Sequence, residues 1–130
     1  MLGNSSARSA DTASDAAQVK LQASSIAEIK ALAEAAGGYK AKDVEFRSTA
    51  HQITITIIDG KLNTGAPAER EAEATRIVSA IARATTDKPA FAKLPVIHVD
   101  YVKRRASKLE PVQRIDFFRT PAGGFVLHKT

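Results

Sequence analysis

The sequence predicts a single α+β domain in two layers, with a mainly antiparallel five-stranded sheet packed by two helices in the order α-β-β-α-β-β-β. Two stretches carry apolar residues at the spacing of three to four that is typical of a helix, and five stretches alternate with the period of two that is typical of a strand. The chain has 130 residues, 44% of them hydrophobic and 25% charged, which is the size and composition of one globular domain.

A polar tail is expected in front of this domain. Residues 1–14 are small and polar, so they bury too little surface to offset their ordering entropy, and the folded domain is expected over residues 15–130. Such a tail also resembles the mature start of an exported bacterial lipoprotein, which favours a periplasmic or lipid-anchored envelope protein over a cytoplasmic one. The alternative is a plain frayed terminus. No apolar run reaches the roughly eighteen residues of a transmembrane segment.

The first helix has two candidate starts and one clear end. Asp15 and Ser25 are each followed, three residues later, by a Gln or Glu that can cap in return. An apolar stripe then follows from Ile26 to Ala36, and the glycines at positions 37 and 38 supply a left-handed stop.

The second helix is predicted to begin at Pro67 and to end before Pro89. Arg70 and Glu73 are assigned to its polar side. The apolar stripe that should face the sheet consists of Ala74, Ile77, Val78 and Ile81.

Five strands are predicted from alternating β-branched and aromatic residues. The first two carry Val44 and Phe46, then Ile53, Ile55 and Ile57, and form a hairpin around residues 48–50. The last three form a meander over residues 96–102, 112–119 and 125–128. Residues 103–108 and 121–124 should form the two turns of this meander.

Several classes of chemistry are excluded by what the chain lacks. It has no cysteine, which excludes disulfides, thiolate zinc sites, iron–sulfur clusters and cysteine nucleophiles. The loop from Asp59 departs from a calcium-binding loop at Lys61, Thr64 and Arg70. Phosphate-loop, dinucleotide, nucleophile-elbow and His-Glu-x-x-His motifs are also missing. We therefore expect no cofactor, and an enzyme is the less favoured hypothesis.

The element order resembles that of profilin-like and roadblock-like domains, and more loosely the curved sheet of nuclear-transport-factor-like proteins. The resemblance is one of order alone, because no residue motif accompanies it. It therefore implies neither an activity nor a ligand, since such scaffolds carry both binding modules and enzymes.

One face of the predicted meander carries polar residues. His98, Asp100, Asp116 and His128 alternate with apolar residues that suit the buried face. Two imidazoles and two carboxylates on adjacent strands could bind a metal ion or perform acid–base chemistry, so a small metal-dependent hydrolase is one alternative function. An ordinary solvated sheet face explains the same pattern, and we prefer it.

The same face also contains apolar residues. Phe118 falls on it, and the alternation places Val102, Val112 and Val126 beside it. An apolar patch on a small sheet can be covered by the first helix, or can bind a protein partner or a second copy of the chain.

The positive charge is concentrated at the C-terminal end. The formal net charge is +5, yet residues 1–102 balance 12 Lys and Arg against 12 Asp and Glu. The excess includes Lys103, Arg104, Arg105 and Lys108, which cluster at a predicted hairpin tip. A solvated turn explains such a cluster; an anionic surface or a nucleic-acid accessory role is the alternative. The leading hypothesis is a non-enzymatic binding or structural module that acts through its sheet face or this hairpin.

Overall fold

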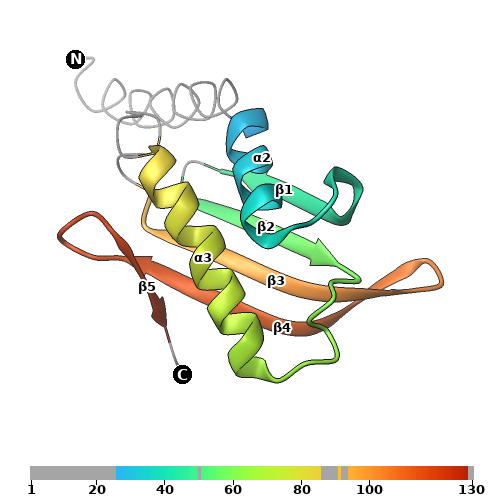
Figure 1. Ribbon diagram of the computed structural model, residues 1–130. Coiled ribbons are helices and arrows are strands. Elements are labelled where there is room, and N and C mark those ends of the chain that lie inside the picture. The colour runs from blue at the N-terminus through green and yellow to red at the C-terminus, as the bar shows by residue number, and fades with distance from the viewer. Residues whose placement is uncertain (1–25, 50, 86–90, 92–93, 129–130) are drawn as a thin grey trace, which may run out of the picture.

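The computed structural model describes residues 26–49, 51–85, 91 and 94–128. The predicted tail and the start of the first helix lie outside these residues. Two helices cover one face of a five-stranded sheet (Figure 1), which confirms the predicted α+β class and element order. The elements are α2 (Ile26–Gly37), a 3₁₀ turn η1 (Ala41–Asp43), β1 (Val44–Ser48), β2 (Gln52–Ile58), α3 (Pro67–Thr85), β3 (Val96–Arg105), β4 (Lys108–Arg119) and β5 (Phe125–His128).

The strands lie in the sheet in sequence order, β1-β2-β3-β4-β5. Three of the four neighbouring pairs are antiparallel, and β2 runs parallel to β3. The parallel pair arises because α3 connects β2 to β3, and a crossover of this length returns the chain to the same end of the sheet. The sheet is therefore mainly antiparallel, as predicted, and the one parallel pair was not predicted.

The hydrophobic core fills the space between the sheet and the two helices. Ile53, Ile55 and Ile57 on β2 are fully buried, and the threonines between them are partly exposed. The predicted stripe of α3 is also buried, together with Ile29 of α2. In the part of the chain that the structure describes, no helix covers the opposite face of the sheet (Figure 1). None of the described helices is both long and apolar enough to cross a membrane.

The hairpin between β3 and β4 is longer than predicted. The strands continue to Arg105 and resume at Lys108, so only Ala106 and Ser107 form the turn. A shift in the pairing register lies between Tyr101 and Val102, and such a bulge inserts one extra residue and changes which side chains share a face. Val112 consequently packs against the core, so its predicted place on the open face was wrong.

Candidate functional site: a basic arm at the end of the sheet

The basic residues lie on a two-stranded extension of the sheet. The last residue of β2, Ile58, pairs with Val102. Beyond this point the described residues provide no third strand, and β3 pairs only with β4. We call residues 103–110 the basic arm. Its residues 103–109 are all exposed, and Figure 1 shows the hairpin running past the end of β2. The arm therefore buries little apolar surface of its own.

Both faces of the basic arm are cationic. The pairing places Lys103 opposite Glu110, Arg104 opposite Leu109, and Arg105 opposite Lys108. Since successive residues point to opposite faces of a strand, the first and third of these pairs share one face. The other face presents the Arg104 guanidinium beside Leu109, whose side chain is exposed.

The charges of the basic arm are poorly compensated within it. Glu110 lies 3.8 Å from the Lys103 ammonium and 3.9 Å from the Arg105 guanidinium. Both ion pairs are long and solvent-exposed, so each contributes little stability. At the end of the arm, Arg105 and Lys108 are direct cross-strand partners, and like charges in this position repel each other. The arm therefore carries an unbalanced cationic end.

The base of the arm is held by the loop that follows β2. The Asp59 amide donates to the Val102 carbonyl at 2.9 Å, and the Asp59 carboxylate accepts from the Arg104 amide at 2.8 Å. The Asn63 side chain also donates to the Val102 carbonyl, at 3.0 Å. Asp59 has a φ of 52°, a left-handed conformation that costs energy for most residues but is tolerated by Asp. These contacts fix the β3 strand of the arm.

A buried arginine fixes the same loop to β4. The Arg70 guanidinium, in the first turns of α3, donates to the Leu62 and Gly65 carbonyls at 2.8 and 2.9 Å. Its Nε donates to the Gln113 side chain on β4 at 2.6 Å. Arg70 is only 6% exposed, so its predicted position on the polar side of the helix was wrong. Its planar fork of donors explains why one side chain can satisfy so many acceptors.

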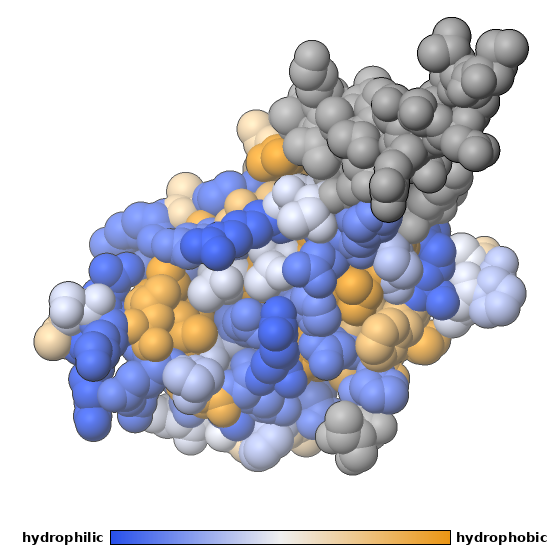
Figure 2. Space-filling view, turned by 180° about the vertical axis from the view of Figure 1, so that it is seen from behind, coloured by the Kyte–Doolittle hydropathy of each residue, from blue (hydrophilic) through white to orange (hydrophobic). Residues whose placement is uncertain are grey.

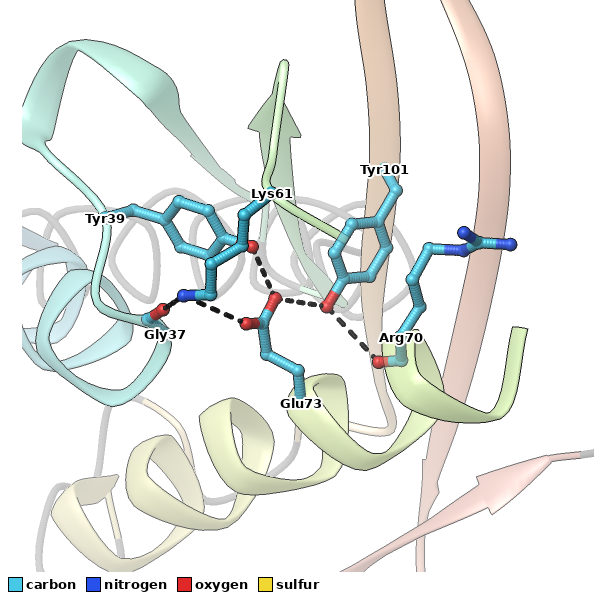
Figure 3. Close-up of polar contacts among 6 residues, drawn as sticks. All are labelled: Gly37, Tyr39, Lys61, Arg70, Glu73 and Tyr101. Carbon is cyan, nitrogen blue, oxygen red and sulfur yellow. Dashed lines mark hydrogen bonds and ion pairs between the residues drawn. The ribbon is translucent and has the colours of Figure 1, made fainter. Parts of the chain in front are cut away.

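A second buried polar cluster lies beneath this loop (Figure 3). The Glu73 carboxylate accepts from the Tyr39 hydroxyl at 2.6 Å and from the Tyr101 hydroxyl at 2.9 Å. Lys61 lies 3.5 Å from the same carboxylate and donates to the Gly37 carbonyl at 2.5 Å. Glu73 is fully buried, which also corrects its predicted place on the polar side of α3. The cluster joins the end of α2, the loop, α3 and β3.

The two tyrosines of this cluster are held in their neutral form. Burial raises the pKa of Tyr39, and its hydrogen bond to Glu73 raises it further. Burial also raises the pKa of Tyr101, with a further increase from the charge of Glu73. Both hydroxyls donate to one carboxylate oxygen, so ionising either would place a second negative charge beside the first.

The four polar residues of the predicted metal or acid–base site lie on the uncovered sheet face, but they do not converge. The Nδ1 of His98 lies 2.6 Å from Asp116, and its Nε2 lies 3.1 Å from the Gln52 side-chain oxygen. Asp100 instead pairs with Arg114 at 3.0 Å. Both ring nitrogens of His98 are thus occupied, whereas a metal needs a free imidazole lone pair.

The fourth residue of that set belongs to an aromatic contact. His128 is the register partner of Asp116, but its ring meets Phe118 edge-on, with centroids 4.8 Å apart. Among the described residues, no group of three or more His, Cys, Asp or Glu is placed to hold a metal ion. These described residues form pairs across neighbouring strands and no shared centre.

A shallow cavity of about 460 Å³ lies on the same face. Its lining mixes the charges of Glu45, Arg47, Asp100 and Arg114 with threonines of β2. Burial raises the pKa of Asp100, while the neighbouring Arg114 guanidinium opposes this shift. The lining thus contains two acidic and two basic side chains, so its surface presents no single sign to a ligand.

The apolar residues of the uncovered face do not form one continuous surface. Phe118 and Val126 are cross-strand partners with exposed side chains, whereas Val102 is nearly buried. In Figure 2 apolar side chains gather in separate patches among hydrophilic ones. Scattered exposed apolar side chains of this kind are ordinary on a protein surface.

The basic arm therefore carries four cations against one carboxylate, Glu110, whose two ion pairs are long and exposed. Sequence reasoning found its four cations but missed the residues that hold it, Asp59, Asn63 and Arg70. The Asp59 loop offered a signal, because Asp and Asn are the residues that stabilise tight turns through their own side chains. Comparison with protein-family models, with curated proteins and with solved structures gave no match to this chain.

Proposed function

We propose that this protein is a binding module that docks on polyanions through the basic arm. The observation that carries the proposal is the last pair of the arm, in which Arg105 faces Lys108 at the end of a ribbon whose residues 103–109 are all exposed. A two-stranded ribbon is at best marginally stable, and opposed like charges weaken it further. An anion between the two side chains would replace this repulsion with two charge-assisted hydrogen bonds.

The anchoring of the arm supports the same function. Asp59 and Asn63 hold one strand at its base, and Arg70 connects the loop to the other strand. A tethered base limits the entropy that the arm loses when it binds, and preorganisation of this kind increases affinity. The arm is thus a cationic hairpin that is held in a fixed position at its base.

The proposal is tested by measuring binding to heparin, used as a generic polyanion, by calorimetry at increasing salt. The test variant is Arg105→Gln with Lys108→Gln. The control is Arg76→Gln with Arg83→Gln, which removes the same charge from exposed positions on α3. We expect salt-sensitive binding that the arm variant weakens about tenfold or more, because most of the attraction is electrostatic. Equal effects of the two double variants would show that net charge, and not the arm, determines binding.

A further inference from the structure

We propose that the polyanion is B-form DNA and that the basic arm enters its major groove. This inference rests on the proposed function and names its ligand. The presence of cations on both faces of the arm supports this proposal. Lys103, Arg105 and Lys108 lie on one face and Arg104 on the other, as the pairing register requires. A planar anionic surface meets one face or the tip, whereas a groove has phosphates on both walls.

The dimensions of the arm also support insertion into the major groove. Its three cross-strand pairs extend about 10 Å at roughly 3.4 Å per residue, and its strands lie about 4.8 Å apart. The major groove of B-DNA is about 12 Å wide and 8.5 Å deep, and it admits a two-stranded ribbon. An arm of this length reaches the floor of the groove before the base of the hairpin meets the phosphates.

The side chains of the arm suit that groove. The guanidinium forks of Arg104 and Arg105 match the paired acceptors O6 and N7 of guanine, and exposed Leu109 is a partner for a thymine methyl group. The arm contains no aromatic residue, so it lacks the stacking surface that single-stranded nucleic acids require. A-form RNA is disfavoured because its major groove is too narrow for side chains to read.

The test measures binding of the full chain to a 20-base-pair DNA duplex by fluorescence anisotropy. The comparison ligands are the RNA duplex of the same sequence, the DNA single strand, and phosphatidylcholine vesicles containing phosphatidylglycerol. With Lys103 and Lys108 on phosphates and the two arginines on base edges, the DNA affinity should fall roughly 12-fold between 50 and 200 mM salt, because the slope is about −0.9 per phosphate contact. Arg105→Gln with Lys108→Gln removes one of these phosphate contacts and should reduce that fall to roughly 3.5-fold. The control pair on α3 should leave it unchanged.

Groove choice is measured by dimethyl sulfate footprinting of the same complex. Guanine N7, which lies in the major groove, should be protected, and adenine N3, in the minor groove, should stay reactive. Equal affinity for the RNA duplex, tighter binding to the vesicles, or protection of adenine N3 would overturn the DNA inference. If heparin binding still depends on the arm in those cases, the polyanion function stands. If heparin binding is insensitive to the arm, both proposals fail.

Discussion

Raising the pH above 10 should destabilise the protein through its two tyrosines. The chain contains two tyrosines and no tryptophan, and both tyrosines donate to the buried Glu73 carboxylate. Their pKa values are raised in the folded protein, whereas an unfolded tyrosine has a pKa of about 10. Above pH 10 the unfolded state therefore loses protons that the folded state retains. The stability provided by the neutral hydroxyls is fully present below pH 10 and is lost as the pH rises.

The size of the effect follows from how deeply each ring lies. Between pH 10 and pH 11, a tyrosine that ionises only in the unfolded state lowers the free energy of unfolding by about 1 kcal/mol, because at pH 10 it is already half ionised there. Tyr101 is 0% exposed and should contribute this full amount. Tyr39 is partly exposed, so solvent screening reduces its share. Together they should lower the free energy of unfolding by about 1.5 kcal/mol between pH 10 and pH 11.

Two measurements check this prediction. Urea denaturation followed by circular dichroism at pH 9, 10 and 11 gives the free energy of unfolding. Absorbance at 295 nm reports tyrosinate, and in the folded protein it should stay low until the chain unfolds. Tyr101→Phe is the control, and its loss of stability between pH 10 and pH 11 should be smaller by about 1 kcal/mol. If tyrosinate absorbance rose near pH 10 while the dichroism stayed native, the assignment of both hydroxyls to Glu73 would be refuted.

Two further predictions concern the core and the uncovered face. Ile55→Ala and Ile81→Ala should each lower the free energy of unfolding by about 2–5 kcal/mol, because both side chains are fully buried between sheet and helices; unchanged urea midpoints would contradict the packing. Zinc should not raise the melting temperature, since both ring nitrogens of His98 are hydrogen-bonded and a ligand stabilises only what it binds. Stoichiometric zinc binding by calorimetry, lost in His98→Asn, would instead restore the metal site as a hypothesis.

The class of the fold was predictable because it depends on local periodicity. The alternation of Ile53, Ile55 and Ile57 with threonines indicates a strand with one buried face, and β2 has that pattern. Pro67 begins α3, as its fixed φ favours at a first helical position. The parallel pairing of β2 with β3 was not predicted. This pairing depends on the position in the sheet to which the chain returns after α3. It joins residues that are far apart in the sequence.

The burial of Arg70 and Glu73 was mispredicted because residue type outweighed spacing. Arg70, Ala74, Ile77 and Ile81 are separated by three or four residues, so one helical face carries all of them. The period therefore placed Arg70 on the buried stripe, while its charge favoured solvent. The structure resolves this conflict by giving the guanidinium three carbonyls and Gln113 as partners.

The length of the basic arm could not be predicted from the sequence either. Residues 103–108 have the composition of a solvated turn, and strand propensity is low for Lys. The strands continue through them because each backbone pair extends the ladder already begun by the core-facing residues. The bulge between Tyr101 and Val102 could not be inferred either, because one extra residue in a strand does not change its amino-acid composition in a recognisable way.

The buried charges of Arg70 and Glu73 are connected to the exposed charges of the basic arm through the loop that follows β2. Lys61 and Asn63 lie in this loop, which Arg70 and Glu73 hold from beneath. Burying a guanidinium and a carboxylate costs desolvation energy that apolar side chains would not incur, so such groups are weak evidence for stability and better explained by the geometry they impose. The geometry imposed here is the position of the loop, which in turn braces the base of the basic arm. A hairpin with Arg105 opposite Lys108 would fray without that brace, because its own pairing is repulsive.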